Sequence, residues 1–257
     1  MKILVTDFDG VICDGLKEYF YSSKLVYQSI WHDSSSIELD SLQSQFNILR
    51  PVVETGWEMP LLLRVLTWGE TPENILKNWH NIKEKAVKLL DLEGINITTL
   101  SKKLDEVREK QIRDDINKWL SLQSLYNGVK AKIKQLINQQ IKIYIITTKE
   151  GKFARQLLEK EGIYLAENTI FGKEVKRPKY ETLRLIIEKE KVEAGEVCFI
   201  EDRLEALELV NQQSDLQQVK LFFALWGYNT EESKQKAQKN PNINLLSLVN
   251  FTSNDVF

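Results

Sequence analysis

Two aspartates, Asp7 and Asp9, stand one residue apart near the start of the chain and are followed by Gly10. The apolar residues 3–5 come just before them, and a short apolar run is typical of a buried parallel strand. Both carboxylates would then lie at the carboxyl end of that strand, where open α/β sheets bind ligands. Side chains two apart on a strand share a face, so the two would approach each other unless the chain turns at Gly10. Two close carboxylates repel, and a cation between them, or a separate role for each, would remove the conflict.

Three further groups of polar residues accompany apolar runs later in the chain. Each group alone is weakly informative, because a threonine at a strand end is usually structural, a basic loop is usually solvated, and an acidic pair often caps a helix. Their order and spacing in one chain make them informative together. The groups are Thr147 and Thr148 after residues 143–146, Lys176, Arg177 and Lys179 before a predicted helix at 180–189, and Glu201 and Asp202 after residues 197–200.

The elements that must position these residues alternate along the second half of the chain. Short apolar runs predict strands at 143–146, 197–200 and 221–225, and amphipathic patterns predict helices at 129–137, 153–158 and 180–189. A possible short apolar element follows at 245–249. Strand and helix in alternation imply a parallel sheet with right-handed crossovers.

In residues 15–124 the apolar residues instead recur at helical spacing. Thr71 followed by Pro72 predicts a helix that begins at the proline, and a charged helix is expected from Thr99. Connections in compact domains are usually only a few residues long, so this segment reads as an insertion that caps or covers the aspartates. We therefore expect a discontinuous, Rossmann-like α/β core at 1–14 and 126–257, and an all-helical cap at 15–125.

Composition narrows the class of protein. The 257 residues are 42% hydrophobic with a net charge of −2, so there is no basic excess to hold nucleic acid. No apolar stretch approaches the roughly 18 residues of a membrane span, and no signal peptide is evident at the start. The two cysteines, Cys13 and Cys198, are expected to be buried free thiols in a reducing cytoplasm. The sequence does not distinguish a monomer from a homodimer.

The four motifs together resemble the haloacid dehalogenase-like hydrolase superfamily, in the subclass with a helical cap after the first strand. The tripeptide 226–228, Trp-Gly-Tyr, and the Glu-Asp form of the fourth motif resemble the branch of phosphoglycolate phosphatase and β-phosphoglucomutase. The resemblance covers residues 1–14 and about 126–230. The cap matches in helical character and position rather than in motif.

The resemblance implies a role for each motif. Asp7 would be the nucleophile, ionised at neutral pH if its pKa is ordinary, and Asp9 would be the general acid and then the general base. Mg²⁺ would be held by Asp7, by the backbone carbonyl of Asp9 and by Asp202. The remaining expected site residues are Thr147 and Thr148 for the phosphoryl oxygens, a lysine for transition-state charge, and Glu201 as an indirect partner of the metal.

The third motif departs from the family pattern. The family often has lysine directly before proline, whereas this chain has Arg177 before Pro178. Lys179, which would open the following helix, is the preferred candidate for the motif's cation, and Lys176 is the second. Arginine is not equivalent to lysine in so compact a site.

These features predict a Mg²⁺-dependent phosphatase that hydrolyses a small phosphorylated metabolite through an aspartyl-phosphate. A sugar-phosphate mutase of β-phosphoglucomutase type uses the same core residues and remains open. So does a binding or regulatory protein on a decayed enzyme scaffold, supported only by the unusual third motif. The cap would select the substrate, and the loop 50–58 is either a lid with Arg50 and Glu54 toward a polar ligand or an ordinary helix connection.

Overall fold

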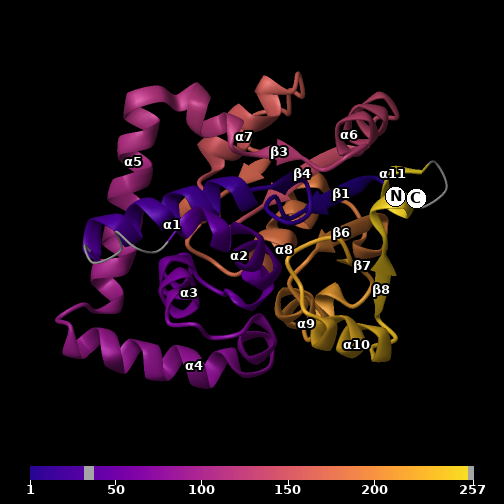
Figure 1. Cartoon of the computed structure of the whole chain (residues 1–257). Helices are drawn as coiled ribbons and strands as arrows, with labels where there is room; N and C mark the ends of the chain where they lie inside the picture. Colours follow the sequence, from indigo (N-terminus) through magenta and orange to yellow (C-terminus); the bar gives the residue numbers. More distant parts are fainter. Residues whose placement is uncertain (32–37, 254–257) are drawn as a thin grey trace. The chain divides into compact units, whose positions relative to one another are not determined.

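The structure, a computed structural model, describes residues 1–31 and 38–253. The chain divides into two compact units, one formed by Met1–Asp14 with Ser124–Phe257 and the other by Gly15–Gln123. The first unit is an α/β core and the described part of the second consists of helices joined by short connections (Figure 1). The predicted fold class, a Rossmann-like parallel-sheet core with an inserted helical cap, is confirmed.

A six-stranded sheet forms the centre of the core, in the order β5-β4-β1-β6-β7-β8, with every neighbouring pair parallel. Two strands were absent from the sequence-based prediction. The two-residue β5 is too short to show a pattern, and the region predicted as one apolar element contains the end of β8. The strands are β1 (Ile3–Thr6), β4 (Lys142–Ile146), β5 (Ile170–Phe171), β6 (Val197–Glu201), β7 (Lys220–Ala224) and β8 (Ile243–Leu246).

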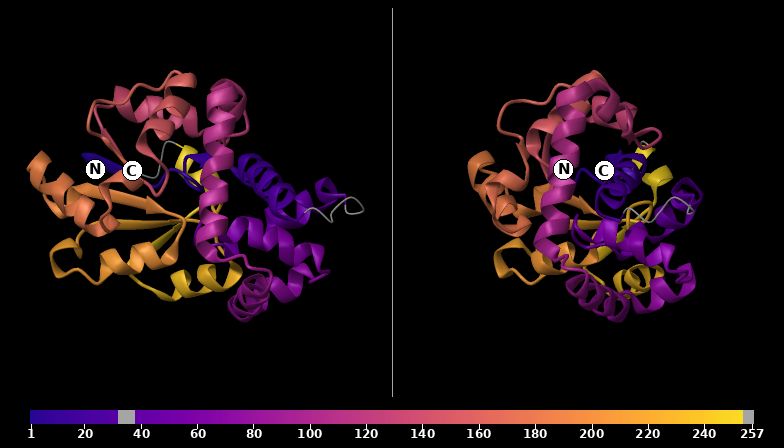
Figure 2. Two further views of the ribbon diagram at one scale, coloured as in Figure 1. Left: turned by 90° about the vertical axis from the view of Figure 1, so that its left-hand side faces the viewer. Right: turned by 60° about the vertical axis from the view of Figure 1, so that its left-hand side comes forward.

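Helices cover both faces of this sheet, as parallel strands require because both faces are apolar (Figure 2). One face carries α8 (Lys179–Glu190), α9 (Leu204–Asn211) and α10 (Glu231–Lys239), and the other carries α6 (Val129–Asn138), α7 (Gly151–Lys160) and α11 (Leu248–Thr252). The hydrophobic cluster on the first face includes Val5, Phe199 and Leu207, all fully buried.

The helical unit leaves and rejoins the core through a pair of very short strands. β2 (Cys13–Asp14) pairs antiparallel with β3 (Ser124–Leu125), and Asp14 lies opposite Ser124. Just before β2 the chain makes a tight turn in which the amides of Ile12 and Cys13 both donate to the carbonyl of Phe8, at 2.9 and 2.8 Å. The insertion thus starts immediately after the segment that carries the first motif.

The inserted unit contains five α-helices among its described residues. As predicted, Pro72 opens its helix and the Thr71 hydroxyl accepts the amide of Asn74 at 3.3 Å. The charged helix begins at Ile97, two residues before the predicted start, because the Asn96 side chain caps it. The helices are α1 (Leu16–Ile30), α2 (Gln43–Leu49), α3 (Glu58–Thr67), α4 (Pro72–Leu92) and α5 (Ile97–Ser121).

Two observations bear on the class of protein. In the described part of the chain, no helix combines the length and apolar character that a membrane span would need. Cys13 and Cys198 are both buried free thiols, as the sequence suggested.

Candidate active site

Three neighbouring strands of the core end at the predicted site residues. Asp7 follows β1 directly, Thr147 follows β4 and Asp202 follows β6, and β1 lies between the other two in the sheet. The register places Thr6 opposite both Ile145 and Ile200. Motifs that are far apart in the sequence therefore meet at one edge of the sheet, as the alternation of strands and helices predicted.

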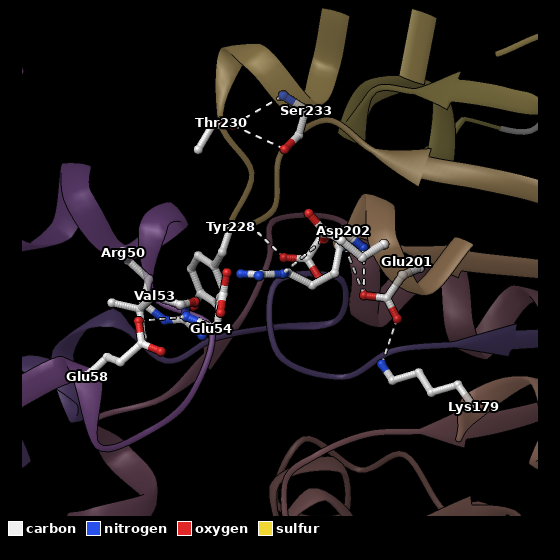
Figure 3. Close-up of polar contacts among 12 residues, drawn as sticks. Arg50, Val53, Glu54, Glu58, Lys179, Glu201, Asp202, Tyr228, Thr230 and Ser233 are labelled. Carbon is white, nitrogen blue, oxygen red and sulfur yellow. Dashed lines mark hydrogen bonds and ion pairs between the residues drawn. The ribbon is translucent and has the colours of Figure 1, made fainter. Parts of the chain in front are cut away.

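A largely buried lysine links the first, third and fourth motifs. Lys179, the first residue of α8, places its Nζ 2.9 Å from Asp7 Oδ1 and 2.6 Å from Glu201 Oε2. Figure 3 shows the contact with Glu201. Glu201 is fully buried, and its Oε1 accepts the amides of Asp202 and Arg203 at 3.1 and 3.0 Å. A side chain held on both oxygens in this way fixes the position of Lys179.

The carboxylates of this cluster outnumber its ammonium group. Asp7, Glu201 and Asp202 each offer an oxygen within 4.8 Å of the others. Burial raises the pKa of Asp7 to about 7 although Lys179 opposes the shift, and burial with the neighbouring Asp7 raises that of Asp202 to about 6. Burial alone would lower the pKa of Lys179, but Asp7 and Glu201 outweigh it and raise that pKa. Without a further cation, burial thus works against ionisation of Asp7, and the ordinary pKa assumed from the sequence does not apply to it.

Among the described residues, Asp9 and Asp7 each form an ion pair with a different lysine. Gly10 adopts a left-handed conformation with φ of 88°, so the chain turns directly after Asp9. Lys149 Nζ lies 3.3 Å from Asp9 Oδ1, so Asp9 is paired with one lysine and Asp7 with another. Of the two arrangements that the sequence allowed, the structure has the one in which the chain turns at Gly10.

The acidic cluster has the donor set and the charge of a divalent metal site. When all are ionised, three carboxylates and the Lys179 ammonium carry a net charge of −2, which a divalent cation would neutralise. Asp202 Oδ1 is buried and accepts no hydrogen bond from the described residues, whereas Asp202 Oδ2 accepts the Tyr228 amide at 2.6 Å. An oxygen left in this state inside a protein is costly unless an ion completes it, so the residues fit Mg²⁺.

The second motif, at residues 147–149, forms a tight loop that is hydrogen-bonded to residues 172–174. The Thr147 hydroxyl is buried and accepts the Lys149 amide at 3.1 Å, which leaves its own hydrogen available to a ligand. The Lys149 carbonyl accepts the Lys173 amide at 2.9 Å, and the two Glu174 oxygens accept the amides of Gly151 and Gly172, each at 3.2 Å. Thr148 is exposed.

The structure separates the three cations of the third motif. Of the three, Lys179 is the one that forms an ion pair with Asp7, at 2.9 Å. Lys176 is exposed, with a left-handed backbone at φ of 49°, and Arg177 donates from Nε to the Thr182 hydroxyl at 3.0 Å. The first preference from the sequence, Lys179, is therefore the residue that the fold places beside Asp7.

Within the helical unit, the loop 50–58 is organised by a buried glutamate. Glu58 accepts the Trp79 indole N–H and the Thr55 hydroxyl, both at 3.0 Å, and its Oε1 lies 3.4 Å from Lys83 Nζ. Arg50 donates to the Val53 carbonyl at 3.0 Å (Figure 3). These contacts give the loop a fixed conformation inside its own unit.

Sequence reasoning missed two residues of the site. Lys149 was not among the predicted site residues, although a basic residue directly after Thr148 was a usable signal. Tyr228 was noted for its tripeptide, but its contact with Asp202 is made by a backbone amide, which no residue type reveals.

Comparisons with known structures find the same fold in several bacterial proteins. A predicted phosphatase from Clostridium acetobutylicum is 16% identical, with a TM-score of 0.59 over 98% of this chain and 96% of that one. A predicted phosphoglycolate phosphatase from Haemophilus somnus is 12% identical, with a TM-score of 0.57 over 91% of both chains. A protein assigned as a β-phosphoglucomutase from Thermotoga maritima is 16% identical, with a TM-score of 0.55 over 98% and 97%.

Sequence comparison gives the family. No curated protein matches the chain. A sequence model of the haloacid dehalogenase-like hydrolases matches residues 1–208, a span that includes all four motifs and the whole helical insertion. The chain belongs to the haloacid dehalogenase-like hydrolase family, and it is an enzyme of the hydrolase class.

Proposed function

We propose that this hydrolase is a Mg²⁺-dependent phosphatase that acts on a small phosphorylated metabolite. The observation that carries the proposal is the buried cluster of Asp7, Glu201 and Asp202 around Lys179 at the carboxyl edge of the sheet. The structural relatives that are described as phosphatases agree with it. Asp7, Asp202 and the backbone carbonyl of Asp9 would hold Mg²⁺, which would supply charge neutralisation for the anionic substrate.

The chain's own residues would divide the reaction between them. An oxygen of Asp7 attacks phosphorus, the ester P–O bond breaks, and the leaving oxygen takes a proton from Asp9. Asp9 then removes a proton from water as that water attacks phosphorus, and the bond from phosphorus to Asp7 breaks to release inorganic phosphate. Thr147 and the backbone amide directly after it donate hydrogen bonds to the phosphoryl oxygens, and Lys179 balances their charge. We propose that the helical unit selects the substrate.

The test is turnover of an aryl phosphate and of a panel of phosphorylated metabolites, with and without Mg²⁺. We expect release of inorganic phosphate that depends on Mg²⁺ and is abolished by a chelator. Absence of metal-dependent release across the whole panel would contradict the proposal and favour a binding protein on this scaffold. Isomerisation of a sugar phosphate that needs a bisphosphate activator would instead favour the mutase. One structural relative is assigned as a β-phosphoglucomutase, so this outcome is tested as well.

A further inference from the structure

The loop after β7 lies against two parts of the proposed metal site at once. This loop, residues 226–228, follows the span matched by the family model, which ends at residue 208. The Tyr228 amide donates to Asp202 Oδ2 at 2.6 Å (Figure 3), and Tyr228 itself is buried. This hydrogen bond occupies one oxygen of the carboxylate, and the other, Oδ1, accepts no hydrogen bond from the described part of the chain.

The side chains of the same loop hold the segment that follows Asp9. The Trp226 indole N–H donates to the Val11 carbonyl at 3.1 Å, and the Tyr228 hydroxyl donates to Asp14 Oδ1 at 3.1 Å. Val11 lies within the turn that follows Asp9, and Asp14 comes after that turn in β2, so the loop is bonded to the turn and to the strand that leaves it. The loop is itself closed by hydrogen bonds from Gly227 N to the Ala224 carbonyl at 3.1 Å and from Asn229 Nδ2 to the same carbonyl at 2.8 Å.

Close packing makes the arrangement sensitive to small changes. A Cβ on Gly227 would lie 2.2 Å from Asp202 Cβ and 2.6 Å from the Gly10 carbonyl oxygen, so only glycine fits between the two motifs. On its other side the Trp226 ring stacks on Phe251 of α11, with ring centroids 5.6 Å apart and an interplanar angle of 15°. Phe251 is fully buried. The loop is therefore backed by the last helix of the core.

We propose that residues 226–228 form a positioning element for the metal, which fixes the Asp202 carboxylate and the Asp9 backbone at a set spacing. The inference rests on the proposed function, because it assumes that these two residues bind Mg²⁺. Outer partners that orient metal ligands typically change metal affinity by about 10- to 100-fold when they are removed. A merely structural loop would change stability without changing metal affinity.

The experiment is calorimetric titration of the full-length protein with Mg²⁺. Tyr228→Phe removes the hydroxyl that bonds Asp14, and Trp226→Phe removes the indole N–H but keeps a ring against Phe251. We expect the double variant to bind Mg²⁺ about tenfold more weakly or worse, with a metal-free melting temperature close to that of the wild type. Tyr164→Phe is the matched control, since Tyr164 is 74% exposed in the same unit, and it should bind as the wild type does.

Gly227→Ala supplies a second, independent variant, expected to weaken binding further because its methyl group displaces Asp202. If Gly227→Ala fails to fold, the double variant, which alters only hydrogen bonds and ring size, decides the matter. A double variant that binds Mg²⁺ within about twofold of the wild type overturns this inference alone, whatever its melting temperature. A wild-type protein that does not bind Mg²⁺ overturns the proposed metal role and this inference with it.

Discussion

At the scale of single residues, the electrostatics of the site depend on Lys179. It is the ammonium group that contacts both Asp7 and Glu201, and its side chain is only 16% exposed. Removal of one partner from a buried charge cluster is far more damaging than the pair is stabilising, because it leaves the remaining charges buried without compensation. The lysine therefore contributes to folding as well as to the proposed chemistry.

This gives a prediction that separates the two lysines of the third motif. Lys179→Gln should lower the free energy of unfolding by about 2 to 4 kcal/mol in the absence of metal, because Asp7 and Glu201 lose their counter-charge. The exposed Lys176→Gln should change it by less than about 0.5 kcal/mol. Urea unfolding of both variants measures the difference. Equal effects of the two substitutions would show that Lys179 does not balance the cluster.

Asp7 carries the prediction for the reaction itself. Asp7→Asn should reduce phosphatase turnover on the order of 10³-fold or more, because an amide cannot form the covalent intermediate. The fold should persist, since an asparagine oxygen can still accept a hydrogen bond from Lys179. The measurement is the rate of phosphate release beside the melting temperature. Substantial residual turnover in a folded variant would mean that Asp7 is not the nucleophile.

At the scale of elements, a buried carboxylate joins the first and last helices of the insertion. Glu18 on α1 is fully buried and accepts Nε and Nη2 of Arg108 on α5, both at 2.8 Å. Ser22 and Trp119 donate to the same carboxylate at 2.6 and 3.2 Å. The bidentate geometry fixes the two helices more firmly than an exposed ion pair would.

We therefore expect Glu18→Gln to destabilise the helical unit locally. A carboxamide presents one donor group where the carboxylate only accepts, so Arg108 loses one of two charge-assisted bonds, at a cost of about 1.5 to 3 kcal/mol. Hydrogen exchange should quicken in α1 and α5 and not in the strands of the core. Glu109→Gln, at an exposed position of α5, is the control and should exchange as the wild type does. Unchanged protection in the Glu18 variant would refute this role.

Elements were predicted from the sequence to the extent that local pattern specifies them. Thr71 and Pro72 marked the start of a helix correctly because capping is a local interaction. The edge strand β8 was missed since its burial pattern is buried at the ends and exposed at Asn244 and Leu245 in the middle. The pairing of Lys149 with Asp9 and of Tyr228 with Asp202 depends on strand order in the sheet, which a run of residue types does not encode.

At the scale of the whole molecule, the buried carboxylates connect stability, pH and metal binding. The pKa of Asp7 is raised to about 7 and that of Asp202 to about 6, so the metal-free folded state holds more protons than the unfolded state between about pH 4 and pH 7. Because the folded state must release these extra protons as pH rises, the two groups make the metal-free protein less stable through that interval.

Bound Mg²⁺ should offset this loss of stability at pH values where the carboxylates are ionised. Metal ions compete with protons for the same oxygens, so the rise in melting temperature on adding Mg²⁺ should be larger near about pH 8 than near about pH 5. Thermal unfolding with and without the ion at the two pH values measures it. The control is Asp202→Asn, which should lose most of the Mg²⁺-dependent rise. A rise independent of pH would argue that Mg²⁺ binds elsewhere.

The pairing of Asp14 with Ser124 bears on how a protein of this kind can diverge. Residues opposite each other in an antiparallel pair have Cα atoms about 5 Å apart, so a two-residue turn could close the same gap that the helical insertion now spans. The entropy of closing a loop grows only slowly with its length. Mutation can therefore lengthen, rebuild or exchange the inserted helices while the sheet edge with its aspartates is inherited intact. Lineages could acquire new substrates in this way without having to reinvent the reaction.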